Sequence, residues 1–173
     1  PAGIDDATLL GTLGASTHTD VVASQPRAVV LARGDAVGRY LVLESLGRGA
    51  AGEVFAAYDS DLDRRVALKL LHASAGDDPA RRRRALAEAQ AMARVQHPNV
   101  TAVFDVGVHA GRLYIAMELV EGTTLGAWLR SRTRTRAEIL AAFSAAARGL
   151  AAAHAVGVVH GDFKPDNVLV EQD

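Results

Sequence analysis

The sequence predicts an α+β fold in which strands and helices are segregated, in two lobes. Strand-like segments separated by turn signals occupy most of residues 39–120. One helical pattern, at residues 76–95, interrupts them, and after residue 122 the apolar period becomes helical. Five strands with one inserted helix, followed by helices, are typical of this fold class.

The first three strands are expected to be consecutive and antiparallel, in "RYLVLESLG", "EVFAAYDS" and "RRVALKLL". The turn signals "GRGAA" and "DLD" separate them. Two further strands, "TAVFDVGVH" and "RLYIAMELV", are joined by a turn at "AG". These segments predict a five-stranded antiparallel first lobe.

The second lobe is predicted to begin with a short helix in "TTLGAWLRS". Thr135 and Glu138 have the spacing of a capping box, which opens a long Ala-rich helix to about Ala155. The last segment, "VVHGDFKPDNVLV", is interpreted as strand, loop and strand. The apolar positions expected along the long helix include Leu140, Phe143, Ala147 and Leu150.

Composition narrows the function classes. The net charge of −1 disfavours a general electrostatic grip on nucleic acid or on an anionic membrane. No cysteine is present, so disulfides, thiolate zinc sites and a Cys nucleophile are excluded, which fits a cytoplasmic protein. The six histidines show no ligand spacing, and no apolar run reaches the length of a membrane span. Residues 1–37 are rich in small residues without periodicity and are expected to form a flexible leader.

A glycine motif stands between the first two predicted strands. Gly47, Gly49 and Gly52 have the spacing G-x-G-x-x-G, which lets a backbone approach phosphate oxygens closely. A dinucleotide-binding site requires a strand followed by a helix, and this motif has strands on both sides. The alternative is an ordinary Gly-rich hairpin.

Lysine is rare in this chain, which has seventeen Arg and only two Lys. Lys69 ends "VALK" in a strand pattern and Lys164 lies in "HGDFKPDN". Where Arg is the habitual cation, a Lys suggests a site that needs a compact point charge, although Lys69 could also be a solvated strand residue. On the following helix, Glu88 either pairs with Arg84 at the surface or faces inward and orients Lys69.

The segment "HGDFKPDN" brings an acid, a cation and an amide close together. Asp162 can accept a proton from an attacking hydroxyl, Lys164 can neutralise a phosphate, and Asn167 can hold a divalent metal. Phosphoryl transfer needs mainly positioning and charge neutralisation, which this cluster supplies. The alternative is a polar turn in which Asp166 and Asn167 act as caps.

Taken in order, "GRGAAGEV", "VALK", Glu88, "HPNV", "MELVEG" and "HGDFKPDN" resemble bacterial Ser/Thr protein kinases of the eukaryotic-like type, over residues 38–173. The resemblance implies a protein-kinase-like fold: a small lobe at 38–118 with one αC-type helix, a hinge at 119–123 and a partial helical lobe at 124–173. It also implies ATP and Mg²⁺ as cofactors, Ser or Thr of a protein as acceptor, and a role in signalling.

The resemblance further implies residue roles by position. Asp162 is the catalytic base, Lys164 reaches the γ-phosphate and Asn167 binds the second magnesium. Lys69, held by Glu88, contacts the α- and β-phosphates. Met117 is the gatekeeper, and the Glu118 carbonyl and Val120 amide hold adenine. The residues expected to bind the nucleotide are Leu46, Gly47, Gly49, Gly52, Val54, Ala67, Lys69, Glu88, Met117, Glu118, Val120 and Leu169.

Two departures from the family pattern stand out. Gly161 stands where the family usually has an Arg that binds a phosphorylated activation loop. Phosphorylation of that loop is therefore not expected to switch the kinase on. The sequence reaches Asp173 without a D-F-G motif, an activation loop or A-P-E. The chain is therefore expected to be a kinase fragment that is inactive or nearly so alone.

The sequence leaves two alternative functions open. A small-molecule kinase of the aminoglycoside or choline type shares "HGD" and Asn167, and Gly161 favours it, whereas Lys164, the complete glycine motif and "HPNV" oppose it. The other rival is a nucleotide-binding pseudokinase module. Retention of Lys69, Asp162 and Asn167 opposes that reading.

Overall fold

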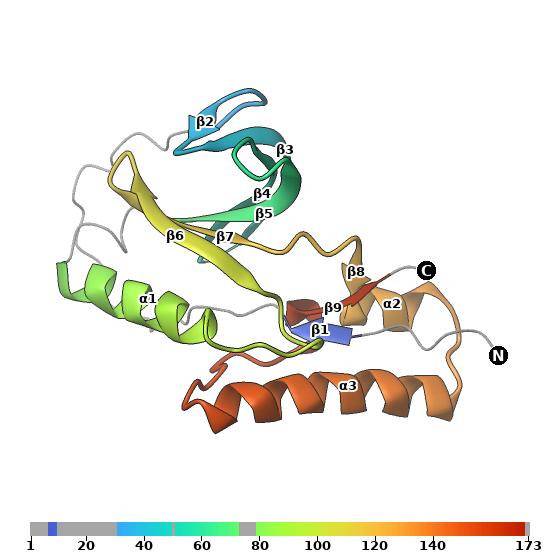
Figure 1. Ribbon diagram of the computed structural model, residues 1–173. Coiled ribbons are helices and arrows are strands. Elements are labelled where there is room, and N and C mark those ends of the chain that lie inside the picture. The colour runs from blue at the N-terminus through green and yellow to red at the C-terminus, as the bar shows by residue number, and fades with distance from the viewer. Residues whose placement is uncertain (1–6, 10–30, 50, 73–78, 172–173) are drawn as a thin grey trace, which may run out of the picture. The chain divides into compact units, whose positions relative to one another are not determined.

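The computed structural model describes residues 7–9, 31–49, 51–72 and 79–171 (Figure 1). The chain divides into two compact units. One comprises residues 14–87 and 104–119 and is called the sheet unit. The other comprises residues 1–13, 88–103 and 120–173 and is called the helical unit.

A six-stranded sheet dominates the sheet unit, with the strand order β2-β3-β4-β5-β7-β6 (Figure 1). The pairs from β2 to β7 are antiparallel. The five predicted strands are present, and a two-residue strand is added at the edge. The bounds are β2 (Ala36–Val37), β3 (Tyr40–Gly49), β4 (Gly52–Asp59), β5 (Arg64–Leu71), β6 (Val103–His109) and β7 (Arg112–Met117).

One face of this sheet forms the core of the unit. Along β5, Val66, Leu68 and Leu70 point to this face because strand side chains alternate. Tyr40 and Tyr114 meet edge to face within the core, with ring centroids 5.8 Å apart. The Tyr40 hydroxyl donates a 3.0 Å hydrogen bond to Asp105. Burial, together with that bond, raises the pKa of Tyr40 to about 12.

The helix predicted between the strands is present as α1 (Pro79–Met92). Ala89 is buried, whereas Ala93 lies beyond the helix and is exposed. The helix ends at Met92, before the end of the predicted pattern at residue 95, and hydrogen-bonded turns continue the chain to Val95.

The described part of the helical unit also contains two helices, a 3₁₀ turn and a three-stranded sheet (Figure 1). The capping box of α3 is confirmed: the Glu138 amide donates to Thr135 Oγ1 at 3.2 Å, and the Thr135 amide donates to Glu138 Oε2 at 2.7 Å. The small sheet has the order β1-β9-β8. The bounds are β1 (Ala7–Leu9), β8 (Gly122–Thr124), α2 (Leu125–Ser131), α3 (Arg136–Ala155), η2 (Pro165–Asn167) and β9 (Val168–Glu171).

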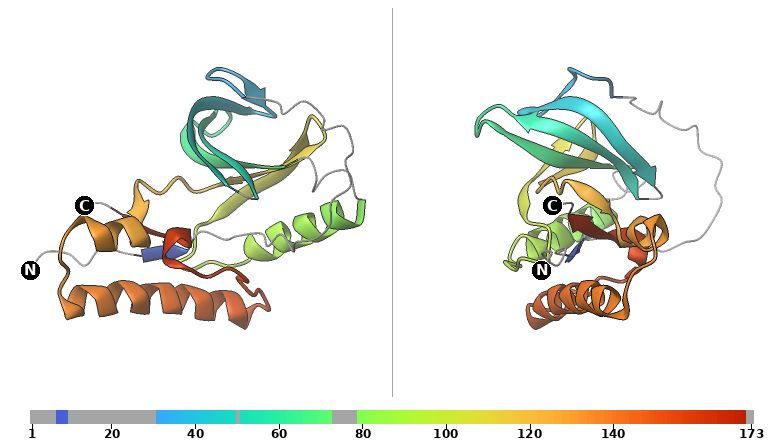
Figure 2. Two further views of the ribbon diagram at one scale, coloured as in Figure 1. Left: turned by 180° about the vertical axis from the view of Figure 1, so that it is seen from behind. Right: turned by 90° about the vertical axis from the view of Figure 1, so that its right-hand side faces the viewer.

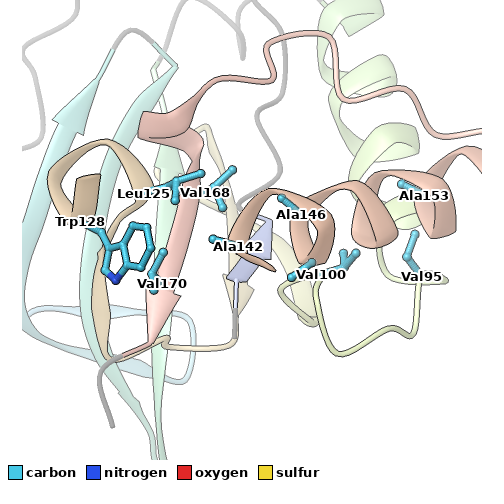
Figure 3. Packing of buried hydrophobic residues seen from close by; sticks show 10 residues of the cluster. Val95, Val100, Leu125, Trp128, Ala142, Ala146, Ala153, Val168 and Val170 are labelled. Atoms are coloured by element: carbon cyan, nitrogen blue, oxygen red, sulfur yellow. The ribbon is translucent and has the colours of Figure 1, made fainter. Parts of the chain in front are cut away.

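The core of the helical unit differs from the sequence expectation at α3. The helix buries small residues: Ala142 and Ala146 lie toward Leu125, Val168 and Val170, and Ala153 lies beside Val95 (Figure 3). Leu140 and Phe143 are exposed by 55% and 37%. Of the apolar positions expected along this helix, Leu140, Phe143 and Ala147 are exposed, whereas Leu150 packs against the core. Small side chains allow a helix to approach its neighbours closely, and α3 packs against β1, as the left view of Figure 2 shows.

The strand expected at Val158–His160 is also absent. Gly157 follows α3 with φ +80°, and the Val158 amide donates to the Ala153 carbonyl at 3.0 Å. This pattern is a Schellman motif, which ends helices at a glycine. The chain at Val158 thus completes the helix cap instead of a sheet.

The leader expected at residues 1–37 contains two short strands. Ala7–Leu9 pairs with Val168–Val170 of β9, and Ala36–Val37 pairs with Tyr40–Leu41. Segments of two or three residues are too short to show a period of two, and only their pairing with another strand defines them. The other residues of the expected leader up to residue 30 lie outside the described ranges.

Within the described ranges, no helix is both long enough and apolar enough to cross a lipid bilayer.

Candidate active site

The glycine motif forms a hairpin between β3 and β4, with Gly49 opposite Gly52. A Cβ at Gly52 would lie 2.3 Å from the Leu70 carbonyl oxygen, so a larger residue would push β4 away from β5. A Cβ at Gly47 or Gly49 would meet nothing within 4 Å. Gly52 is therefore required for strand packing, while the other two leave the hairpin surface open for a close approach.

Lys69 lies in the middle of β5 and is only 7% exposed. Its burial lowers the pKa of the ammonium group, because the charged form is the one that loses solvation. The alternative of a solvated strand residue is wrong, because the strand buries this side chain. A buried ammonium is costly unless an anion compensates it, which marks Lys69 as a candidate for phosphate binding.

Strand register brings four predicted nucleotide-binding residues to one face of the sheet. Val54 pairs with Lys69, and Ala67 pairs with Met117. Residues 67 and 69 of one strand share a face, so Val54, Ala67, Lys69 and Met117 lie on the face opposite the core. These four residues place the Lys69 ammonium group among small and apolar side chains, a surface suited to a flat base with a charged tail.

Other predicted residues lie at separate places. Leu46 is 51% exposed beside the hairpin, and the Glu118 side chain is exposed just after β7. Glu88 is exposed on α1, and its pairing with Lys69 stays a prediction. Val120 and Leu169 belong to the helical unit, where both are half-buried.

The loop before β9, in the helical unit, holds a polar cluster of its own. Lys164 Nζ is 2.7 Å from Asp162 Oδ2. The Asn167 side-chain amide donates to the Asp162 carbonyl at 2.8 Å and to its Oδ2 at 3.1 Å. The bond from Lys164, and then the bond from Asn167, lowers the pKa of Asp162, although partial desolvation opposes both. The three predicted catalytic and metal-binding residues of this loop therefore form one cluster with an ionised carboxylate at its centre.

Backbone geometry sets the direction of Asp162. Its amide donates to the His160 carbonyl at 2.9 Å, which closes a γ-turn around Gly161 at φ +74°. On the other side, the Asn167 amide donates to the Lys164 carbonyl at 2.9 Å within η2. Val168, fully buried in the core, then fixes the end of the loop.

Gly126 is a neighbour of this loop that the sequence analysis missed. A Cβ on Gly126, in the first turn of α2, would lie 2.5 Å from Asp166 Oδ1. The absent side chain therefore lets the loop pack against α2. A single glycine inside an apolar helix pattern carries no signal of such a contact.

Comparisons with known proteins show which family the chain belongs to. Residues 40–173 match the family described as the protein kinase domain. The chain belongs to the protein kinase family. The kinase domain is 42% identical over 142 residues to the serine/threonine-protein kinase PksC of Streptomyces coelicolor, covering 77% of this chain and 26% of PksC. To PknE of Mycobacterium tuberculosis it is 38% identical over 141 residues, covering 81% of this chain and 25% of PknE.

Solved structures give the same result for the fold. A crystal structure of the Mycobacterium tuberculosis PknI kinase domain superposes with a TM-score of 0.72 at 34% identity, covering 81% of this chain and 58% of that one. The structure of a double mutant of the same domain superposes with a TM-score of 0.75 at 33% identity, covering 83% of this chain and 60% of that one. The protein-kinase-like fold and the bacterial Ser/Thr kinase resemblance are confirmed. The chain spans about a quarter of the length of the curated relatives that it matches.

Proposed function

We propose that the kinase domain binds MgATP and transfers the γ-phosphoryl group to a Ser or Thr hydroxyl of a protein. The observation that supports this most strongly is the cluster of Asp162, Lys164 and Asn167. Two donors bind Oδ2 of Asp162, and among the described residues no hydrogen bond to its Oδ1 is present. That free oxygen suits a general base that accepts the proton of an attacking hydroxyl.

Each polar residue takes one part of the transfer. Lys164 neutralises charge on the transferring phosphoryl group. Lys69 binds the α- and β-phosphates, because a buried ammonium gains most from an anionic partner. Neither residue needs to form a covalent bond, since phosphoryl transfer depends mainly on positioning and on electrostatic stabilisation.

The donor set also fits a magnesium ion. The side-chain nitrogen of Asn167 donates both of its hydrogen bonds to Asp162. In the described part of the chain, the side-chain oxygen of Asn167, Oδ1, has no hydrogen-bond partner. Amide and carboxylate oxygens are the ligands that Mg²⁺ prefers. Bound with ATP, the ion would neutralise the charge that develops on the phosphate oxygens.

The remaining roles follow from the resemblance. Leu46, Val54, Ala67 and Leu169 would wall the adenine pocket, with Met117 as gatekeeper. The Glu118 carbonyl and the Val120 amide would hold adenine, and Glu88 would orient Lys69. A cytoplasmic location is proposed as well, supported by the use of ATP and by the absence of cysteine.

Binding is tested on the 173-residue chain by calorimetry with MgATP. The Lys69→Met variant removes the ammonium and should weaken the affinity at least about tenfold. Arg65→Met is the matched control, because it removes an exposed cation from the same strand and should leave the affinity unchanged. Equal affinities of the parent and the Lys69→Met variant would refute the role of Lys69.

Transfer is tested on the natural gene product that contains these residues. Asp162→Asn keeps the size of the side chain but removes the base, and should lower kcat about 10²–10⁴-fold with little change in MgATP affinity. Asp166→Asn, an exposed acid in the same loop, is the control. Phosphorylation of an aminoglycoside or choline without any phosphoprotein would contradict protein kinase activity, and MgATP binding without transfer would favour the pseudokinase reading.

A further inference from the structure

Two charged side chains at the far end of the sheet are buried and have no place in the proposed reaction. Glu53 of β4 is 6% exposed and Arg112 of β7 is 5% exposed. Taking two charges out of water is costly unless their partners are well placed. Their contacts therefore indicate what the pair holds in position.

Arg112 binds the end of β5. Its Nε donates to the Leu71 carbonyl at 2.8 Å, and its Nη2 lies 3.4 Å from the Leu70 carbonyl. The pairing of β5 with β7 extends as far as Leu70 opposite Tyr114. Beyond that point, the guanidinium group binds the carbonyl of Leu71, where no backbone pairing with β7 continues. The planar fork is suited to this because it presents several donors in fixed directions.

The same guanidinium reaches the glycine-rich hairpin through Glu53. Arg112 Nη2 is 3.9 Å from Glu53 Oε1, and Glu53 Oε2 is 3.1 Å from Arg48 Nη2. Arg48 lies between Gly47 and Gly49 and pairs with Glu53 across the hairpin. One carboxylate thus joins both strands of the hairpin to β7.

A second contact binds the hairpin to the end of β5. His72 Nε2 is 2.9 Å from the Gly49 carbonyl oxygen, and the His72 amide donates to the Ala51 carbonyl at 3.3 Å. Both contacts occur at the tip of the hairpin, where glycines allow many backbone conformations. The tip is therefore held by side chains and by the strand that carries Lys69.

This cluster does not share a face with the residues proposed to bind the nucleotide. Glu53 pairs with Leu70, which belongs to the core face, whereas Val54 pairs with Lys69 on the opposite face. Burial lowers the pKa of Arg112 and the neighbouring Glu53 raises it, and an arginine remains a cation at neutral pH in either case. Any influence of the cluster on a nucleotide must act through the backbone of the hairpin.

We propose that Arg112 is a positioning residue: through Glu53 it fixes the glycine-rich hairpin in the conformation that binds the phosphates of the nucleotide. The proposal rests on the proposed function for its nucleotide. In this proposal, Arg112 and Glu53 contribute to binding of the triphosphate but not to binding of the adenine base. A flexible hairpin would have to be ordered at the cost of binding free energy, and a preorganised one would not.

The test compares the affinities for MgATP and for adenosine in Arg112→Met, which keeps the length of the side chain and removes the fork. MgATP should bind roughly tenfold more weakly, while the affinity for adenosine changes less than about twofold. Arg112→Lys keeps the charge but lacks the planar guanidinium group, and its affinity for MgATP should lie between that of Arg112→Met and that of the parent. Arg65→Met is the control. Equal losses for both ligands, or no loss for either, would overturn the proposal.

Amide hydrogen exchange separates this proposal from the proposed function. In Arg112→Met, the amides of residues 51–54 should exchange at least about tenfold faster, while those of residues 66–69 keep their rates. Glu53→Gln is a second variant with the same expectation, available if the first does not fold. Unchanged exchange at the hairpin in a folded variant overturns the proposal. A parent chain that does not bind MgATP contradicts the proposed function and leaves this result intact.

Discussion

Gly161 shows how one residue directs the candidate catalytic loop. Its φ of +74° closes a γ-turn that hydrogen-bonds the Asp162 amide to the His160 carbonyl. A side chain at this position would meet no atom within 4 Å, so space is not the constraint. The constraint is backbone conformation, because residues with a Cβ rarely adopt a positive φ.

Substitution of Gly161 tests this directly. Gly161→Ala should lower the free energy of unfolding by about 1–2 kcal/mol, because alanine is strained at this φ. Gly47→Ala also meets open space but lacks a positive φ, and should change the stability by less than about 0.5 kcal/mol. Urea unfolding of both variants gives the comparison, and equal costs would show that the turn imposes no strain.

The loop cluster was predictable from sequence, and the Glu53–Arg112 pair was not. Asp162, Lys164 and Asn167 lie within six residues, so a short loop brings them together whatever the rest of the fold. The rarity of lysine marked Lys69, and its burial agrees with that argument. Glu53 and Arg112 each look like a solvated strand residue, because their partner is far along the chain and depends on strand order.

Helix α3 buries small residues, while its larger apolar residues Leu140 and Phe143 are exposed. Its buried residues are Ala142, Ala145, Ala146, Gly149 and Ala153, which recur at helical spacing. Because alanine is common on every side of this helix, its few larger apolar residues give a mixed signal: Leu140 and Phe143 are exposed, whereas Leu150 packs against the core. Close approach to the strands, set by the fold, therefore decided which face is buried.

Two adjacent alanines of α3 provide a matched test. Ala146 is fully buried and Ala147 is exposed. Ala146→Leu should lower the free energy of unfolding by about 1–3 kcal/mol through overpacking. Ala147→Leu should change it by less than about 0.5 kcal/mol. Chemical unfolding monitored by circular dichroism measures both, and a larger cost at position 147 would show that the helix is rotated from this arrangement.

The capping box makes α3 sensitive to acid. The backbone and side-chain hydrogen bonds of Thr135, followed by the bond from Arg132, lower the pKa of Glu138 to about 2 from its ordinary 4.5. A carboxylate whose pKa is lower in the folded state stabilises the fold above its unfolded pKa. This contribution should be complete above about pH 4.5 and be lost as the pH falls to about 2.

Glu138→Gln should abolish that part of the pH dependence of stability. Glu44→Gln, an exposed acid of the sheet, is the control and should keep the slope of the parent. The measurement is the free energy of unfolding at a series of pH values between 7 and about 2. A Glu138→Gln profile that superposes on the parent profile would refute the role of this carboxylate.

Long elements were predicted well and short ones poorly. β5 and α3 have the predicted bounds because each combines a sustained period with clear start and stop signals. β1 and β8 have three residues each, and their pairing with β9 is a tertiary feature. The β-branched Val158 resembled a strand residue, but the cap after Gly157 determined its conformation.

At the scale of the whole molecule, the order of strands and helices was sufficient to predict the fold class. Family membership followed from several motifs in sequence, each weak alone. The two lysines belong to different units, Lys69 to the sheet unit and Lys164 to the helical unit. The central claim of the proposed function is that both serve one nucleotide triphosphate.

The most direct test of that claim is labelling with an acyl phosphate of ATP. A lysine amine beside the phosphates attacks the acyl carbon, an amide forms and ATP leaves. The chain has only two lysines, so mass spectrometry reads each one separately. We predict that Lys69 and Lys164 are both labelled and that excess MgATP suppresses the labelling of both. Labelling of the lysines that MgATP does not reduce would contradict the account.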